Sequence, residues 1–252
     1  MLKAGNPLSE EFHKESKKKS SSTGVDLDRS QWPQEWLTTY FKHYDRFPRF
    51  SLPDPVKEIA TEKNLFLVLE NRKTNRSFSG KGVSSEELST WLKYACGETS
   101  SLDEARMRRT YPSGGARYSV EHYVLLLKES GDLKKGIYHY RVDSHELELV
   151  TEDSFLKIEL ENITEAEWVR GAAFVHIMTS VFWRSQNKYK ERGYRLLLLE
   201  AGHVGQNAYL VSGALGMGCC ALSGVFEDVL EKAIGLDEKT ESIVHTVVVG
   251  TL

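Results

Sequence analysis

Three cationic side chains and two hydroxyls lie within six residues of this chain, at Arg72, Lys73, Thr74, Arg76 and Ser77. Guanidinium groups form paired hydrogen bonds with phosphate oxygens, and hydroxyl groups supply further donors. The set therefore suits a phosphate monoester. A solvated turn between two elements has the same composition, and composition alone favours the turn.

A pair of glycines lies in the segment Pro112-Ser113-Gly114-Gly115. Adjacent glycines let the backbone approach a flat ligand and leave its N–H groups accessible as donors. The spacing differs from that of a P-loop and from that of a dinucleotide-binding fingerprint. Taken alone, the segment is interpreted as a turn ahead of a strand that begins at Val120.

A lysine and a tyrosine are adjacent at Lys188-Tyr189, ahead of a long apolar run. A lysine at the edge of a desolvated cleft can act as a general base, and a neighbouring tyrosine can donate or relay a proton. On spacing alone, the simpler interpretation is an exposed pair on a charged loop.

Charge is distributed unevenly after this pair. Residues 187–195 hold five charged side chains, whereas no Asp, Glu, Lys or Arg occurs between Glu200 and Glu227. This pattern predicts a helix that begins at the surface and continues through the core over residues 196–215. Polar side chains carried inward need hydrogen-bond partners or a function. They are Glu200, His203, Gln206 and Asn207.

Glu200 and His203 also have the i, i+3 spacing of a di-iron helix. The surrounding pattern is not that of a four-helix bundle, so we predict no metal site and assign His203 as a hydrogen-bonded core histidine. A glycine-rich segment with Ser223-Gly224 follows the helix. It could end the helix and cradle a ligand, or simply end the helix.

Size and composition exclude several classes of protein. The 252 residues carry a net charge of −3, so overall charge gives no indication of a nucleic-acid partner. Three cysteines without a CxxC motif are typical of a reduced, intracellular protein. The N-terminus lacks the apolar segment of a secretory signal. The uncharged span 201–226 holds six glycines, unlike a membrane helix. We therefore expect a cytoplasmic protein with no membrane partner.

The elements that must position these residues can be predicted from periodicity. Ser84 and Glu87 have capping-box spacing, which predicts a helix that stops at Gly97. Irregular alternation of helices and strands favours an α+β fold over a doubly wound sheet. The other predicted elements are strands at 120–128, 136–141 and 146–150, a helical segment at 153–170, a central buried strand at 172–183, an amphipathic helix at 227–234 and a closing strand at 243–250.

The first 60 residues differ in composition from the rest, so we divide the chain into an N-terminal extension, 1–60, and a domain, 61–252. Residues 17–24 are typical of a solvated tail. Seven aromatic residues between positions 31 and 60 indicate an arm that packs over the core or over a neighbouring subunit.

Taken together and in this order, the motifs resemble the nitroreductase-like flavoproteins. Within them the chain is similar to the SagB-type branch, the FMN-dependent azoline dehydrogenases of thiazole/oxazole-modified peptide biosynthesis. Residues 12–17 are similar to the amino-terminal signature of that branch. Five ordered matches are far more specific than any one motif. They are RKTNRSFSG (72–80), YPSGGARYSVEHY (111–123), and residues 136–150, 188–210 and 216–237.

The resemblance implies a nitroreductase-like α+β fold with a mixed central sheet flanked by helices. It also implies an intertwined homodimer that holds FMN at the subunit interface. By the same resemblance, Arg72, Lys73, Thr74 and Arg76 grip the FMN phosphate and ribityl chain. Lys73 and Thr74 replace the commoner Arg and Ser, which conserves a charge and a hydroxyl.

Further site residues follow from the same resemblance. Residues 112–115 fall on the loop beside the isoalloxazine, and Gln206, Ser223 and Gly224 match other cofactor-lining positions. Lys188-Tyr189 matches the pair that azoline oxidases need for catalysis. Ser119 stands where a proline is usual, so we expect a looser loop there.

The function implied is oxidation of a thiazoline or oxazoline in a ribosomal precursor peptide to the aromatic azole. Lys188 is the expected base and Tyr189 the proton relay or orienting donor. An azoline-containing peptide is the expected substrate, and a cyclodehydratase complex is a further partner. Three alternatives remain: an NAD(P)H-dependent nitro or quinone reductase on the same fold, an azoline oxidase of non-ribosomal synthesis, and a non-catalytic scaffold subunit of a cyclodehydratase complex.

Overall fold

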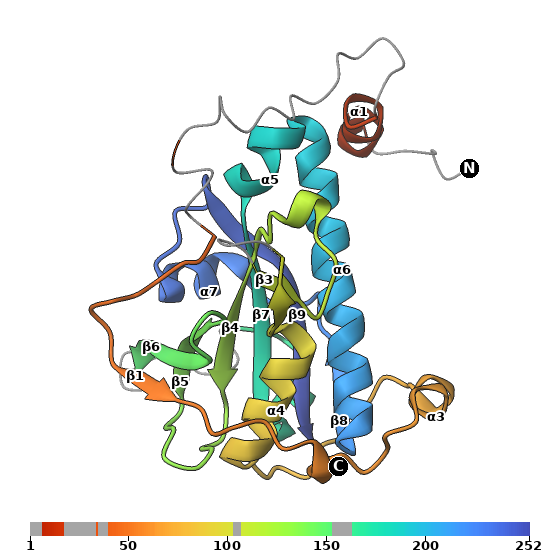
Figure 1. Cartoon of the computed structure of the whole chain (residues 1–252), viewed down its shortest axis with the longest axis vertical. Coiled ribbons are helices and arrows are strands. Elements are labelled where there is room, and N and C mark those ends of the chain that lie inside the picture. Colours follow the sequence, from red (N-terminus) through yellow and green to blue (C-terminus); the bar gives the residue numbers. More distant parts are fainter. Residues whose placement is uncertain (1–6, 18–33, 35–39, 103–106, 153–162) are drawn as a thin grey trace.

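A seven-stranded antiparallel sheet forms the centre of the computed structural model (Figure 1), which describes residues 7–17, 34, 40–102, 107–152 and 163–252. The strand order is β1-β6-β5-β4-β7-β9-β8. The strands are β1 (Arg49–Ser51), β4 (Val120–Leu126), β5 (Gly136–Arg141), β6 (Glu146–Glu152), β7 (Phe174–Val181), β8 (Met217–Ala221) and β9 (Glu241–Thr251), with a separate pair formed by β2 (Glu98–Ser101) and β3 (Met107–Arg109).

The predicted α+β class is confirmed. The β5–β6 hairpin and the closing strand are present, and every residue of β4 and β7 is buried, as expected for central strands. The strand predicted at 172–183 ends at Val181, because Phe182 and Trp183 already belong to a helix. The helices are α1 (Pro7–Glu15), α3 (Leu65–Asn71), α4 (Ser85–Cys96), α5 (Phe182–Tyr189), α6 (Glu191–Ala214) and α7 (Glu227–Ile234), with 3-10 turns at η2 (Lys57–Ile59), η3 (Gly114–Ala116) and η5 (Glu167–Gly171).

Helices cover both faces of the sheet. α4 and α6 bury their apolar residues in one cluster, and α7 and η5 bury theirs in a second cluster on the opposite face. The predicted capping box of Ser84 and Glu87 starts α4, whose C-cap is Gly97. The indole N–H of Trp91 donates to the Ser212 hydroxyl at 2.8 Å, which ties α4 to α6.

Helix α6 runs along the length of the molecule, with α5 at one end and α3 at the other (Figure 1). It begins at Glu191, earlier than predicted, and it buries only one face. The assignment of His203 to the core is wrong, because the helix lies on the surface of the sheet and His203 is on its exposed side. The buried stripe has helical spacing: Leu197, Ala201, Val204, Ala208 and Ser212.

Two predictions fall partly outside the described residues. Of the helical segment expected at 153–170, residues 153–162 lie outside, and the described remainder contains the 3-10 turn η5. Part of the aromatic arm also lies outside, but β1 belongs to it and pairs with β6 of the main sheet. None of the described helices is long and apolar enough to cross a membrane.

A buried charge cluster lies within the sheet around His139 on β5. Its Nε2 is 2.9 Å from Glu121 and its Nδ1 is 3.0 Å from Glu148, and the rings of Tyr44 and Tyr123 pack against it. Burial opposes the charged imidazolium. The two carboxylates nevertheless raise the pKa of His139 above its usual value.

We predict that the free energy of unfolding falls as the pH rises from about 6.5, the ordinary histidine pKa, through the raised pKa of folded His139. The folded state binds this proton more tightly than the unfolded chain does. The stabilisation is therefore complete below the unfolded pKa and lost above the folded one. His139→Gln should flatten this dependence and lower the free energy of unfolding by about 3 kcal/mol at low pH, since buried carboxylates lose their partner.

Urea titrations across this pH window measure the effect. His43→Gln is the matched control, because His43 is an exposed histidine that pairs with Asp143 at 3.2 Å. A His139→Gln profile as steep as that of the wild type would show that His139 does not carry the pH dependence.

Candidate functional site

The structure brings Lys188 and Tyr189 to the backbone of Gly115. A Cβ atom placed on Gly115 would lie 2.6 Å from the Tyr189 Oη and 2.8 Å from the Lys188 Nζ. The Lys188 ammonium lies 5.2 Å from the centre of the Tyr189 ring. These three residues, here the Lys–Tyr cluster, unite two segments that are far apart in the sequence. Gly115 belongs to the glycine loop, residues 112–119.

Lys188 and Tyr189 are the last residues of α5, so the interpretation of the pair as part of a loop is wrong. Both are half-buried. The sharp turn from α5 into α6 requires glycine at position 193, because a Cβ there would lie 2.7 Å from the Cα of Gln186. The Ser185 hydroxyl donates to the Gly193 carbonyl at 3.1 Å, which fixes this turn.

The glycine loop is tied to α6 by the carboxylate of Glu200. Glu200 is buried and accepts hydrogen bonds from the hydroxyls of Ser113 and Ser119 and from the backbone N–H of Val120, the last at 3.1 Å. Burial raises the pKa of Glu200, although these donors oppose the shift. Glu200 therefore has the partners that the sequence required of it, and Ser119, where a looser loop is expected, is one of them.

The cationic segment, residues 72–76, lies beside the other end of α6. The guanidinium of Arg72 is 5.4 Å from the centre of the Tyr209 ring, and that of Arg76 is 6.0 Å from the centre of the Trp168 ring. The hydroxyls of Thr74 and Tyr209 are 3.1 Å apart. Sequence reasoning missed both aromatic residues, because their spacing to the cations carries no local signal.

A cavity of about 210 Å³ adjoins this segment, lined in part by Arg72, Lys73, Asn75, Tyr209 and Cys219. The Asn75 N–H donates to the Cys219 carbonyl at 2.9 Å, which holds the segment against β8. The side chains of Arg72, Lys73 and Arg76 are exposed. Cations and a hydroxyl on a fixed backbone suit a phosphate group.

The two clusters stand at opposite ends of α6. The glycine loop contacts α6 at Leu196, and the cationic segment contacts it at Tyr209. These positions are about 20 Å apart along the helix at a rise of about 1.5 Å per residue. Gln206 is exposed on α6 between them. Ser223 and Gly224 are exposed after β8.

Cys96, His122 and His176 form a buried group that no sequence spacing indicated. Their ligand atoms lie within 4.8 Å of one another, and the two imidazoles approach to 3.2 Å. Burial lowers the pKa of His176 to about 3, so this imidazole is neutral. The guanidinium of Arg109 acts electrostatically on both Cys96 and His122 and would oppose a divalent cation. We therefore assign no metal to this group.

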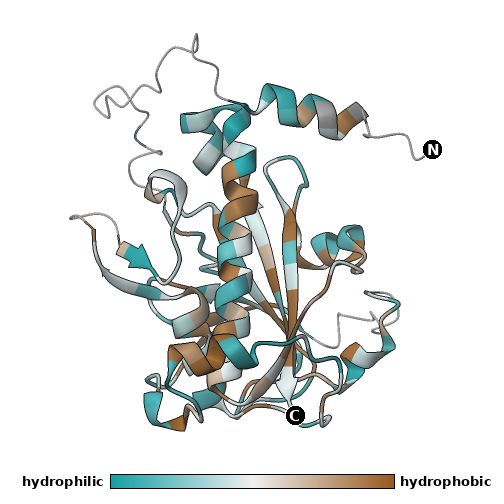
Figure 2. Ribbon diagram, turned by 90° about the vertical axis from the view of Figure 1, so that its right-hand side faces the viewer, coloured by the Kyte–Doolittle hydropathy of each residue, from teal (hydrophilic) through white to brown (hydrophobic). Residues whose placement is uncertain are grey.

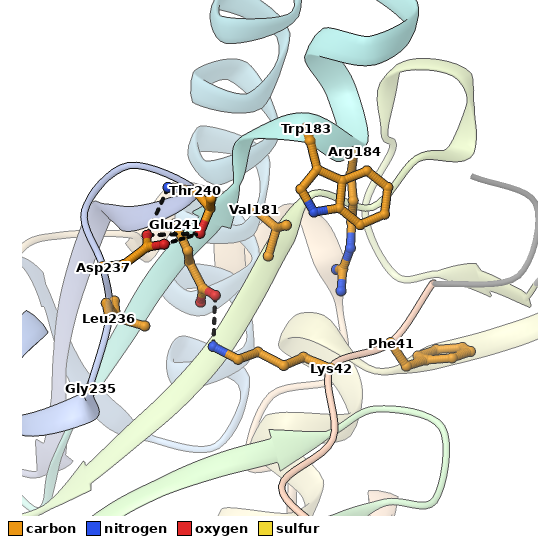
Figure 3. A pocket seen from close by; sticks show the side chains of 10 residues that line it. All are labelled: Phe41, Lys42, Val181, Trp183, Arg184, Gly235, Leu236, Asp237, Thr240 and Glu241. Atoms are coloured by element: carbon orange, nitrogen blue, oxygen red, sulfur yellow. Dashed lines mark hydrogen bonds and ion pairs between the residues drawn. The ribbon is translucent and has the colours of Figure 1, made fainter. Parts of the chain in front are cut away.

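A larger cavity, of about 370 Å³, is lined by the first turn of α5 and by Lys42 and Glu241, which form an ion pair at 2.7 Å (Figure 3). Trp183 and Arg184 project from α5 on this side. The cavity thus borders the same helix that carries the Lys–Tyr cluster at its far end.

The structure is thus an α+β protein in which a cationic segment lies at one end of α6 and, at the other end, Lys188 and Tyr189 of α5 contact the glycine loop. A family model described as the nitroreductase family matches residues 69–251. The chain belongs to the nitroreductase family.

Two curated relatives are named as processing proteins. The chain is 28% identical to the trifolitoxin-processing protein TfxB of Rhizobium leguminosarum bv. trifolii over 84% of its own length and 59% of that protein. It is 31% identical to the microcin B17-processing protein McbC of Escherichia coli over 56% of its own length and 53% of that protein. The chain thus spans between half and two thirds of the length of these relatives.

A solved structure of the E. coli microcin synthetase McbBCD complex, with truncated pro-MccB17 bound, contains a chain of similar fold. The TM-score is 0.58 and the identity 22%, over 97% of this chain and 92% of that chain. At this identity the similarity supports the fold.

We predict that Gly115→Ala displaces the side chains of the Lys–Tyr cluster. Gly115 has a φ of +65°, and a Cβ there would clash with the Tyr189 Oη and the Lys188 Nζ. Gly80→Ala is the matched control, because Gly80 has a φ of +81° and open space around it. Both variants should lose about 1–2 kcal/mol from the left-handed backbone.

Gly115→Ala should lose little more than Gly80→Ala, because the two atoms in contact are the ends of flexible side chains that can move away. Chemical denaturation compares the two losses, and the ring resonances of Tyr189 in NMR spectra report its displacement. Unchanged Tyr189 resonances in Gly115→Ala would show that this side chain does not crowd Gly115.

Proposed function

We propose that this protein is an FMN-dependent dehydrogenase that oxidises thiazoline or oxazoline rings of a ribosomal precursor peptide to thiazoles or oxazoles. The observation that carries the proposal is the contact of Lys188 and Tyr189 with the glycine loop at Gly115. Membership of the nitroreductase family supports a flavin oxidoreductase. Similarity to proteins that process microcin B17 and trifolitoxin supports a peptide substrate.

The residues of each cluster fit one end of FMN, and because the clusters of one chain lie about 20 Å apart along α6, the flavin would be held at the interface of a homodimer. Arg72, Lys73 and Arg76, with the hydroxyl of Thr74, would hold the phosphate and the ribityl chain beside the cavity at the end of α6. The glycine loop would lie along the flat ring system, because glycines leave its backbone open to a planar ligand. The exposed Gln206, Ser223 and Gly224 would complete the lining.

FMN, when bound, would supply the acceptor for the hydride that leaves the azoline ring. Lys188 would remove the proton from the adjacent ring carbon, and Tyr189 would orient or relay that proton through its Oη. Loss of one hydride and one proton converts the azoline to the azole. Because the product ring is aromatic, the main task of the protein is to position substrate and base.

We further propose that a second copy of the chain covers the exposed face of α6. Figure 2 shows apolar turns on the side of α6 that faces the viewer. Large apolar residues exposed at both ends of this face favour an interaction site. A homodimer would also bring further residues to the flavin, and the other subunits of a synthetase, such as a cyclodehydratase, would deliver the peptide. Exposed apolar residues on α6 and α3 are Leu198, Leu199, Leu65, Phe66, Leu67 and Leu69.

We predict that Arg76→Ala weakens FMN binding about 10- to 100-fold, because a hydrogen bond to a charged group contributes about 1.5–3 kcal/mol. Flavin fluorescence titration of apo-protein, repeated at two salt concentrations, measures the affinity. Lys232→Ala removes an exposed cation on α7 and is the control. A purified protein that is colourless and takes up no FMN would instead favour the scaffold subunit.

We predict that Lys188→Ala lowers the turnover of an azoline peptide by at least about 100-fold, as expected for loss of a general base, while FMN remains bound. Tyr189→Phe should reduce turnover by a smaller factor. Anaerobic bleaching of the flavin absorbance by a short azoline peptide measures the reaction, with Lys190→Ala as the neighbouring-lysine control. Wild-type rates in both variants would refute the mechanism. Rapid bleaching by NADPH without peptide would favour a nitro or quinone reductase.

A further inference from the structure

The backbone of the glycine loop adopts an unusual conformation beside the Lys–Tyr cluster. Gly115, Ala116 and Tyr118 all have positive φ, at +65°, +52° and +46°. Glycine adopts such angles freely, whereas alanine and tyrosine do so only when their surroundings hold them there. Ala116 and Tyr118 therefore require a restraint, and Glu200 acts on the loop at other residues.

Two buried arginines supply part of this restraint, in addition to the Ser113 hydroxyl, which accepts a hydrogen bond from the Tyr118 N–H at 2.8 Å. Arg184 on α5 is 2% exposed, and its guanidinium donates to the Tyr118 carbonyl at 3.1 Å. In return, the guanidinium of Arg117 donates to the Arg184 carbonyl at 2.6 Å. α5 and the loop are thus cross-linked in both directions. Arg184 also forms an ion pair with Glu121 on β4.

The position of Arg184 relates this cross-link to the Lys–Tyr cluster. Arg184 precedes Lys188 by one helical turn on the same short helix, and Tyr118 follows Gly115 closely in the loop. A restraint between Arg184 and Tyr118 therefore sets the separation between Lys188 and Gly115. Desolvation makes a buried ion pair a weak contributor to stability, whereas an unpaired buried charge is strongly unfavourable. The pair with Glu121 consequently fixes the guanidinium in one place.

We propose that Arg184 is a positioning residue. Anchored by Glu121, it holds the strained loop against α5 and thereby places Lys188 and Tyr189 beside Gly115, where the flavin would bind. This inference rests on the proposed function for its kinetic consequence. Its structural consequence, restraint of the loop by α5, holds whatever the substrate is. In this proposal the buried Arg184 acts through the loop and not by contact with substrate or cofactor.

The test compares Arg184→Met with Arg184→Lys and with a matched control. Arg141→Met is that control, because Arg141 is a buried arginine of the same charge network that pairs with Asp143 at 2.7 Å and contacts neither α5 nor the glycine loop in any described bond. With the FMN-loaded full chain and an azoline peptide, Arg184→Met should lower kcat about 100-fold, the order expected for a displacement of about 1 Å. KM and flavin content should stay near wild type, and Arg184→Lys should recover part of kcat.

Two further readouts separate positioning from general stability. Hydrogen exchange of apo-protein should accelerate at residues 113–119 and 182–190 in Arg184→Met and not in Arg141→Met. Arg184 lines the 370 Å³ cavity of Figure 3. Methylguanidinium in the buffer should therefore restore part of the lost rate to the truncating variant Arg184→Ala and leave Lys188→Ala unchanged.

The proposal is overturned if Arg184→Met keeps wild-type kcat and loop exchange, or if Arg141→Met accelerates loop exchange and lowers kcat to the same extent. If Arg184→Met does not fold, Glu121→Gln replaces it, with the same expected increase in loop exchange. Should the wild type oxidise no azoline peptide, the proposed function fails, and the exchange experiment still decides the role of Arg184.

Discussion

The close packing of α6 on the sheet is the constraint on which the rest of the molecule depends. Small residues allow it: a Cβ at Gly205 would lie 2.9 Å from the His245 ring on β9, and Ala201 and Ala208 are buried on the same face. Because the helix lies this close, Glu200 reaches the glycine loop at one end, and Tyr209 reaches Thr74 at the other. Both candidate clusters are therefore placed by one helix.

Several buried polar residues fix the geometry of the glycine loop. The single carboxylate of Glu121 contacts both Arg184 and His139, two buried groups from different elements. Although burial opposes its charge, these partners hold the pKa of Glu121 well below its usual range. Apolar residues of the same volume could pack as well. They could not direct hydrogen bonds to a particular carbonyl, and the loop conformation requires such bonds at Tyr118. Part of the charged interior thus lies beside the strained backbone of the glycine loop.

Sequence patterns predicted most of the fold because its signals are local. The capping box at Ser84, the apolar run that forms β7 and the β5–β6 hairpin each depend on a few adjacent residues. The exposed side of α6 was not predictable in the same way. A long uncharged run fits a buried helix equally well, and only the position of α6 on the sheet shows that His203 faces outward.

The residues of the candidate site likewise fall into two groups, those that the sequence indicated and those that only the structure shows. The residue types of the cationic segment and the glycine loop were evident from composition, and resemblance alone singled out Lys188-Tyr189. Glu200 was marked as a polar residue in need of partners, which the structure supplies. Arg184 and Arg117 carried no signal, because their partners are backbone carbonyls that become neighbours only after α5 and the loop pack together. Long-range contacts with backbone groups leave no trace in residue spacing.

The arrangement also bears on the choice between oxidation of an azoline and simple reduction of a nitro group or quinone. A reductase that takes hydride from a nicotinamide needs an open flavin face and no base that removes a proton from carbon. Here the Lys188 and Tyr189 side chains fill the space that a Cβ at Gly115 would need. Buried charged residues of α5 and α6 fix the loop that carries Gly115. Such restraint suits the proposed function, in which the distance from base to substrate matters. Abstraction of a ring proton, in concert with loss of hydride from the adjacent carbon, has that requirement.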